Sequence, residues 1–164
     1  MEEEKTAAIV SSSSMTADLD APLHALGFQF EDFSPKKVSG RLHLTEICCQ
    51  PFRRLHGGVS ALIAEALASL GAVMASGYQR IASVHLSISH LKPANLGDHV
   101  FAEATPINVG KTMQVWEVQL WRIDPSNSQR ISLVASSRVT VLSNMPMPEH
   151  LIDDAARIGK YAKL

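Results

Sequence analysis

The sequence predicts an α+β domain in which an antiparallel sheet wraps around one long central helix. Residues 58–76 carry apolar side chains at helical spacing on one face and mainly Ala, Ser and Gly on the other. A helix of this kind is buried on most sides. Two strand-like runs precede it and four follow it, joined by short turns. Strands grouped in this way favour an antiparallel sheet packed on the helix.

The N-terminal part of the predicted domain starts with a short helix. Residues 18–26 have helical character, with Asp18 or Asp20 as the capping residue and Gly27 at the end. Apolar and polar residues then alternate, which indicates two strands, over residues 28–33 and 38–44. A loop over residues 46–55 leads to the long helix.

The C-terminal half of the predicted domain is rich in strands. Gly77 ends the long helix, as glycine commonly does at helix C-termini. Four strand-like runs follow, over residues 81–91, 99–106, 112–123 and 129–142. Trp116 and Trp121 have opposite parity on one of these strands. We therefore expect one tryptophan to face the core and the other to face outward.

The composition is that of one globular domain. The chain has 164 residues, of which 46% are hydrophobic and 19% charged, and its net charge is −1. A chain of this length buries enough surface to fold without disulfides or a structural metal. The adjacent Cys48 and Cys49 favour a reducing compartment. The chain has no excess of basic residues, which argues against nucleic-acid binding. Glu65 interrupts the longest apolar run, so we expect no membrane span.

Both termini are predicted to lie outside the domain, which we place at residues 18–144. Residues 1–17 have an acidic start and a serine run, and we expect a disordered tail there. Residues 145–164 are expected to form a second tail that stands off the domain and ends in Ala162-Lys163-Leu164. This end is one conservative step from the Ser-Lys-Leu peroxisomal address, with a chance match as the alternative. The sequence thus predicts a protein of the peroxisomal matrix, with the import receptor as a partner.

Glu65 is the residue of the long helix that most requires an explanation. It is the only charged residue between Leu55 and Gln79. An unpaired buried carboxylate is costly. Glu65 therefore either reaches solvent or an arginine at a helix edge, or acts as a base or nucleophile in a cleft. Ser69 lies one turn further along the same face, where it can contact Glu65 or a water held by it.

A second group of candidate residues lies just before the long helix. Gly57 and Gly58 open the helix, so unpaired amide N–H groups point out of its N-terminus and offer a site for an oxyanion. Gln50 can add an amide donor, and His56 is either a helix cap or part of the site. Carbonyl-polarising donors, a carboxylate and a hydroxyl suit attack on an acyl carbonyl, and they come from Gln50, His56, Gly57, Glu65 and Ser69.

These residues resemble the hotdog-fold acyl-CoA thioesterases, in the branch that cleaves aromatic and aryl-acetyl CoA esters. The similar strings are Gln50-Pro51, His56-Gly57-Gly58-Val59-Ser60, Glu65, Ser69, residues 87–94 and Val109-Gly110-Lys111. The likeness covers about residues 20–143. With the peroxisome-like end, the chain is similar to the plant peroxisomal enzymes that hydrolyse 1,4-dihydroxy-2-naphthoyl-CoA in phylloquinone synthesis.

The resemblance implies a role for each matching residue. Glu65 would be the catalytic carboxylate, which attacks the thioester or activates water, and Ser69 would orient it. Gln50 and the Gly57 amide would polarise the thioester oxygen, and His56 would position the acyl group. The resemblance also implies a site built across a homodimer, two dimers in a homotetramer, and an acyl-CoA substrate with no separate cofactor or metal.

The residues that would hold the CoA part of the substrate are not settled by the sequence. Basic and hydroxyl side chains suit phosphate groups. The candidates are Arg53, Arg54, His90, Lys92, Lys111, Ser136, Ser137 and Arg138. For Arg53 and Arg54, a solvated pair in the loop is the favoured interpretation, with CoA binding as the alternative. The seven histidines show no metal-ligand spacing.

Two other functions remain open at this point. A broad-specificity peroxisomal acyl-CoA thioesterase would use the same residues on varied acyl groups. A non-catalytic acyl-CoA binding protein would keep the pocket but would not need Glu65 on a buried helix face. The carboxylate therefore favours an enzyme.

Overall fold

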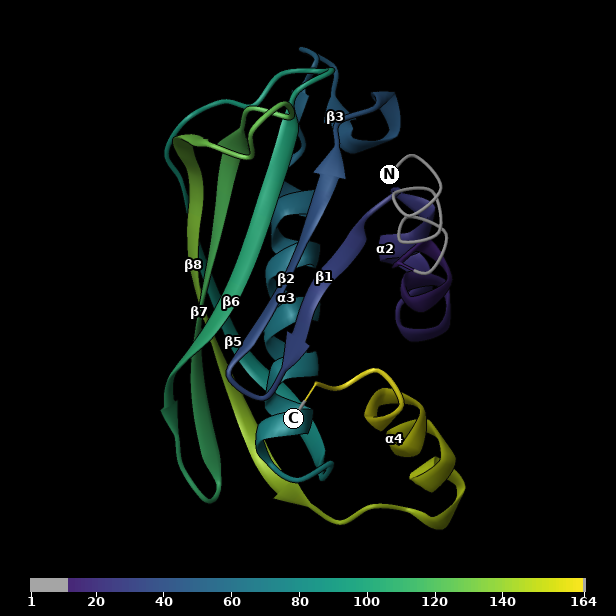
Figure 1. The fold of residues 1–164 in the computed structure, drawn as a ribbon. Coiled ribbons are helices and arrows are strands. Elements are labelled where there is room, and N and C mark those ends of the chain that lie inside the picture. The colour runs from purple at the N-terminus through teal and green to yellow at the C-terminus, as the bar shows by residue number, and fades with distance from the viewer. Residues whose placement is uncertain (1–11, 164) are drawn as a thin grey trace.

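A six-stranded sheet wraps around α3 (Gly57–Ala75) in the computed structural model, which describes residues 12–163 (Figure 1). The other elements are α2 (Ala21–Ala25), β1 (Gln29–Ser34), β2 (Lys37–His43), η1 (Glu46–Cys48), β3 (Cys49–Gln50), β4 (Arg54–Leu55), β5 (Arg80–His90), β6 (His99–Val109), β7 (Met113–Ile123), β8 (Arg130–Met145), η2 (Glu149–Leu151) and α4 (Ile152–Gly159). The predicted order of a short helix, two strands, a long helix and four strands is confirmed. The predicted loop over residues 46–55 also contains a short hairpin, β3–β4.

All neighbouring strands of the main sheet run antiparallel, as predicted. The strand order is β1-β2-β6-β7-β8-β5. The strand that follows α3 in the chain, β5, therefore lies at one edge of the sheet, beyond β8. β5 also packs against α3. This places the start of β5 close to the middle of the helix, which matters for the site.

The hydrophobic core lies between α3 and the inner face of the sheet. Ile63 and Leu67 of α3 and Trp116 of β7 are fully buried there. Trp121 points to the other face and is only partly buried, as its parity predicts. Along α3, however, one stripe is only half-buried or exposed, and it comprises Gly58, Ala61, Leu62, Glu65, Ser69 and Val73.

The expectation of a disordered tail over residues 1–17 is wrong for residues 12–17. Residues 12–19 are helical, and Thr16 is fully buried. The Ser12 hydroxyl donates to the Phe30 carbonyl oxygen at 2.7 Å, so this helix is attached to β1. A polar run that buries little by itself is ordered here by its contacts with the sheet. Residues 1–11 lie outside the described residues.

The expectation that residues 145–164 stand off the domain is also wrong. The chain returns to the sheet through α4, which contacts α3, and the segment after α4 runs back towards the end of β1 (Figure 1). The Tyr161 hydroxyl donates to Asp18 Oδ2 at 3.0 Å, and the Lys163 amide donates to the Phe33 carbonyl oxygen at 2.8 Å. Ala162 packs against the core. The folded unit therefore extends beyond the predicted domain boundaries on both sides.

By length and composition alone, α3 is also capable of crossing a membrane, as many core helices are. In this structure 56% of its most apolar window is buried inside the protein. Its apolar character is thus used at least in part for packing against the sheet.

Asp20 provides a stability prediction for the N-terminal region. Its carboxylate caps α2 by accepting from the Leu23 N–H at 2.8 Å. Burial raises the pKa of Asp20, the Leu23 hydrogen bond partly lowers it, and the charge of Glu65 raises it further. A raised pKa in the folded state means that stability falls as the pH rises above the pKa of the unfolded chain.

We therefore expect Asp20→Asn to raise Tm at pH 7, by about 1–4 °C, because asparagine caps a helix equally well without a partly buried charge. The gain should shrink towards pH 4, where the native aspartate is increasingly protonated. Thermal unfolding of both proteins at pH 7 and pH 4 measures this. A Tm that falls at pH 7 would show that the charge itself stabilises the fold.

Candidate functional site

Glu65 is held by two serine hydroxyls on one of its two carboxylate oxygens. The Ser69 hydroxyl donates to Glu65 Oε1 at 2.7 Å, and the Ser83 hydroxyl donates to the same atom at 2.7 Å. The two hydroxyl oxygens are 3.0 Å apart. Glu65 Oε2 has no hydrogen-bond partner among residues 12–163. One oxygen thus fixes the carboxylate, and the other is left to accept a proton or to attack an electrophile.

Each member of this group is positioned by a different structural constraint. Glu65 and Ser69 are one helical turn apart on the half-buried stripe of α3. Ser83 is exposed near the start of β5, next to a register shift between Ser83 and His85. Because β5 packs against α3, the Ser83 hydroxyl reaches the carboxylate. The predicted Glu65–Ser69 contact is present, and the sequence analysis missed Ser83.

We expect Ser83→Ala to lower kcat by about tenfold with little change in KM. A hydrogen bond to a charged group contributes roughly 1.5–3 kcal/mol. Only a part of this stabilisation of the carboxylate is expected to be lost in the transition state for hydrolysis. Thiol release from an acyl-CoA ester measures the effect, with Ser87→Ala on the same strand as the matched control. Equal activity of Ser83→Ala and wild type would mean that Ser69 alone fixes Glu65.

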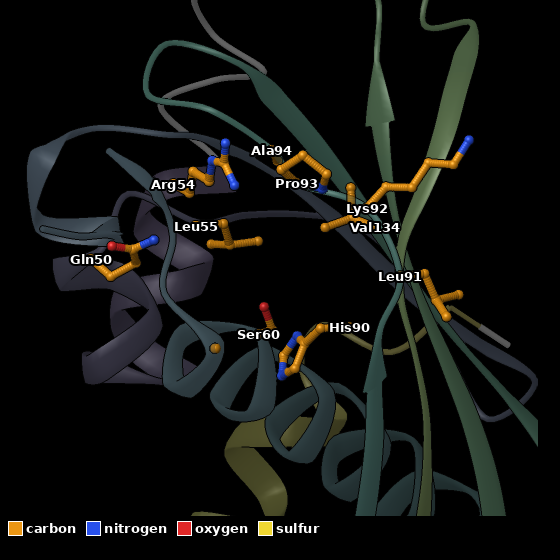
Figure 2. Close-up of a pocket in the computed structure, with 11 residues that line it drawn as sticks. Gln50, Arg54, Leu55, Ser60, His90, Leu91, Lys92, Pro93, Ala94 and Val134 are labelled. Atoms are coloured by element: carbon orange, nitrogen blue, oxygen red, sulfur yellow. The ribbon is translucent and has the colours of Figure 1, made fainter. Parts of the chain in front are cut away.

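A separate cavity of about 430 Å³ lies at the N-terminus of α3. Figure 2 shows Gln50, Ser60 and His90 around it, with Leu55 between Gln50 and Ser60. Its lining comprises Gln50, Arg54, Leu55, Gly57, Ser60, His90, Leu91, Lys92, Pro93, Ala94 and Val134. The cavity therefore combines apolar walls with amide, hydroxyl and imidazole groups and two cationic side chains.

The N-terminus of α3 presents a free donor to this cavity. His56 is the N-cap, and its Nδ1 accepts from the Gly58 N–H at 2.9 Å. The Gly57 N–H has no hydrogen-bond partner within residues 12–163. A Cβ at Gly57 would lie 3.2 Å from His90 Nε2, so the imidazole covers this glycine closely. The donor predicted at Gly57 is thus available, while His56 serves as a helix cap.

Gln50 is oriented as a donor by its own loop. Its side-chain oxygen accepts from the Phe52 N–H within the turn of the β3–β4 hairpin. Arg53 completes that turn with a positive φ of 58°, which is typical of three-residue hairpin loops. Because the oxygen is occupied, the Gln50 amide nitrogen is the free end, and in Figure 2 it faces Leu55 and the cavity.

The candidate CoA contacts are spread over the molecule. Arg54, Lys92 and His90 line the cavity, whereas Arg53 lies in the hairpin turn beside it. Lys111 follows the end of β6, at the opposite end of that strand from the cavity. On β8, Arg138 is exposed and lies 3.8 Å from Glu117, and Ser136 is half-buried.

Ser137 does not suit the predicted role in CoA binding. It is buried on the inner face of β8, and its hydroxyl donates to the Val118 carbonyl oxygen at 2.9 Å. Strand parity explains the difference, because neighbours on a strand point to opposite faces. In the described part of the chain, no three His, Cys, Asp or Glu side chains gather as a metal site.

The two candidate groups do not meet within one chain. Neither Glu65 nor Ser69 lines the cavity that holds Gln50 and Gly57. Glu65 lies eight positions after Gly57 on the helix, which is roughly 12 Å along the axis. The carboxylate lies instead on the uncovered stripe of α3. The chain therefore presents two separate half-sites: the donors at the N-terminus of α3, and the carboxylate on one face of that helix.

Comparison with known proteins identifies the architecture and the chemistry. The sequence model of the thioesterase superfamily matches residues 52–128. The chain is 57% identical to 1,4-dihydroxy-2-naphthoyl-CoA thioesterase 2 of Arabidopsis thaliana, over 87% of this chain and 91% of that protein. It is 35% identical to 1,4-dihydroxy-2-naphthoyl-CoA hydrolase of Listeria monocytogenes, over 58% of this chain and 77% of that protein.

A solved structure shares the fold. Zebrafish thioesterase superfamily member 2 superposes with a TM-score of 0.69 at 20% identity, over 82% of this chain and 96% of that one. The predicted hotdog fold is thus confirmed. The fold, the carboxylate on the long helix and the identity to a thioesterase point to the same family. The chain belongs to the thioesterase superfamily and is an acyl-CoA thioester hydrolase.

Proposed function

We propose that this enzyme hydrolyses 1,4-dihydroxy-2-naphthoyl-CoA to 1,4-dihydroxy-2-naphthoate and CoA, as a step of phylloquinone synthesis. The observation that carries the hydrolytic mechanism is the anchoring of Glu65 through Oε1 alone, by Ser69 and Ser83. The names of the Arabidopsis and Listeria relatives support the choice of acyl group. A broad-specificity acyl-CoA thioesterase is the second candidate, because a cavity of about 430 Å³ with mixed polar and apolar walls does not by itself select one acyl group.

The proposed reaction needs one carboxylate and two donors. Glu65 Oε2 takes a proton from a water whose oxygen attacks the thioester carbon, or Oε2 attacks that carbon itself. The electron pair of the C=O bond moves onto oxygen, where the Gln50 amide and the Gly57 N–H stabilise the negative charge. Its return expels the CoA thiolate, a good leaving group. When water attacks, this step gives the free acid, and the proton held by Glu65 passes to the thiolate. When Oε2 attacks, the step leaves a mixed anhydride on Glu65, which a water molecule then hydrolyses to release the acid and restore the carboxylate. Neither version calls for a metal or a separate cofactor.

We infer that two chains build each site as a homodimer. In one chain the carboxylate and the donors are separate half-sites, and the stripe of α3 that carries Glu65 is uncovered. The adjacent edge strand β5 has unpaired backbone groups along its outer side and an exposed Val84. A second copy covering this face would bring Gln50 and Gly57 of one subunit to Glu65 of the other. Two such dimers would form the homotetramer.

Arg54 and Lys92 are the proposed partners of the CoA phosphates. Both lie on the cavity that contains Gln50 and Gly57, so a thioester held by those donors leaves its CoA part within reach. Arginine and lysine favour phosphate groups. Arg53, in the adjacent turn, is a further candidate for the same role.

We also propose that the C-terminal Ala162-Lys163-Leu164 directs the protein to the peroxisomal matrix through an import receptor. The resemblance of this end to the Ser-Lys-Leu address supports the proposal. Expression of the chain with a fluorescent protein fused at its N-terminus, with and without the last three residues, tests it. A cytosolic signal from the intact C-terminus would refute it.

A panel of CoA esters tests the proposed substrate. Thiol release would be measured for 1,4-dihydroxy-2-naphthoyl, benzoyl, phenylacetyl and palmitoyl CoA. We expect kcat/KM for the naphthoyl ester to exceed the others by well over tenfold. Equal rates on all four esters would establish the broad-specificity enzyme. Binding without hydrolysis of any of them would leave a binding protein.

A further inference from the structure

Ser60 carries a buried hydroxyl without a hydrogen-bond partner in the described part of the chain. It lies in the first turn of α3, and the residue is 1% exposed. Its Oγ forms no hydrogen bond within residues 12–163. Ser60 also lines the cavity that contains Gln50 and Gly57, and Figure 2 shows its oxygen directed into the space between Leu55 and His90.

An unpaired buried hydroxyl is costly unless something supplies a hydrogen bond. A serine in a helix can satisfy its hydroxyl on the carbonyl oxygen four residues earlier. Here that atom, the His56 oxygen, accepts from the Val59 N–H at 2.9 Å and the Ser60 N–H at 3.1 Å, and the Ser60 hydroxyl does not bond to it. The Ser60 hydroxyl turns instead to the cavity, so its partner is expected to come from what the cavity holds.

We propose that Ser60 is a specificity residue that binds a hydroxyl group on the aromatic ring of the acyl group, next to the thioester. This inference rests on the proposed function. The thioester oxygen belongs at the Gly57 N–H, at the mouth of the helix. A ring hydroxyl adjacent to the thioester lies beside that oxygen, and Ser60 is one helical turn deeper in the same cavity. Its hydroxyl both donates and accepts, as a phenol does.

The contact is expected to be selective because Ser60 Oγ has no hydrogen-bond partner within residues 12–163. Leu55, Ala94 and Val134 form apolar walls of the cavity, and the His90 imidazole, which also lines it, forms no hydrogen bond with Ser60. A ring without the hydroxyl would leave Ser60 unpaired, and a ring with it would satisfy both groups. A site built to bind a substrate hydroxyl discriminates more strongly than an apolar pocket does.

Two esters that differ only in the ring hydroxyl test the proposal. These are 1-hydroxy-2-naphthoyl-CoA and 2-naphthoyl-CoA, assayed by thiol release with full-length wild type, Ser60→Ala and the isosteric Ser60→Cys. We expect both variants to lose about 10- to 100-fold in kcat/KM on the hydroxylated ester. The change on 2-naphthoyl-CoA should stay within about twofold. Tm should be unchanged or higher, because a hydroxyl without a protein partner is removed.

The other outcomes separate the two proposals. An equal loss of kcat/KM on both esters would mean that Ser60 contacts the thioester itself or supports the helix. Unchanged kcat/KM on both esters would mean that Ser60 takes no part in the site. Either result overturns the proposal. If wild type cleaves benzoyl-CoA but neither naphthoyl ester, the proposed substrate falls, and the Ser60 assignment with it. Hydrolysis of both naphthoyl esters with unaltered discrimination refutes Ser60 alone.

Discussion

Glu65→Gln should lower kcat for thioester hydrolysis by roughly a thousandfold, within the range expected for loss of a general base. The amide keeps the size of the side chain and can still accept from Ser69 and Ser83, which both contact Oε1 in the native protein. It can neither take a proton from water nor attack a carbonyl. Binding of the acyl-CoA should change little, because the proposed CoA contacts, Arg54 and Lys92, lie on the cavity at the other half-site.

Gln50→Ala is the matched comparison for this variant. It removes one of two proposed oxyanion donors, so we expect a smaller loss in kcat, on the order of 10²-fold.

Mixing the two variants adds a test of the proposed dimer. A heterodimer of Glu65→Gln and Gln50→Ala chains contains one site with both native residues, and it should recover activity. Wild-type rates for Glu65→Gln would refute the mechanism, and failure to recover activity would refute the shared site.

Gly71→Ala should destabilise the fold by about 2 kcal/mol, and lower Tm by roughly 4–8 °C. A Cβ at Gly71 would lie 2.6 Å from two ring carbons of Trp116. The indole has little freedom to retreat, because it is fully buried and its Nε1–H donates to Gln114 Oε1 at 2.9 Å. Gln114 in turn donates to the Ala72 carbonyl oxygen at 3.1 Å. The helix preference of alanine, up to about 1 kcal/mol, offsets only part of the clash.

Gly159→Ala in α4 is the control for this substitution. Its Cβ would meet only Tyr78, at 3.5 Å, which is ordinary contact distance. We expect its Tm to stay level or to rise slightly. Thermal unfolding of both variants at one protein concentration decides the matter, since association alters Tm. A Gly71→Ala protein as stable as wild type would show that Trp116 has room to move.

Much of the fold could be predicted because local patterns and tertiary packing agree in this chain. The long helix and its lone charge at Glu65 follow from composition, and Trp116 and Trp121 follow from strand parity. Ser83 could not be predicted, because it lies 18 positions after Glu65 in the chain and only the packing of β5 on α3 brings the two together. The order of residues 12–17 depends likewise on distant contacts, such as Ser12 with Phe30. Ser60 carries no signal in sequence beyond being a small residue in a helix.

The docked C-terminal segment has a consequence for any receptor that recognises Ala162-Lys163-Leu164. In this structure Lys163 is already hydrogen-bonded to Phe33, and Tyr161 is bonded to Asp18. A receptor that needs an extended peptide must compete with these contacts. It binds only the fraction of molecules in which the segment has detached, and its apparent affinity is weakened in proportion to that fraction. Under the proposed targeting to peroxisomes, the residues that complete the folded domain would thus also set how readily the proposed signal is available to its receptor.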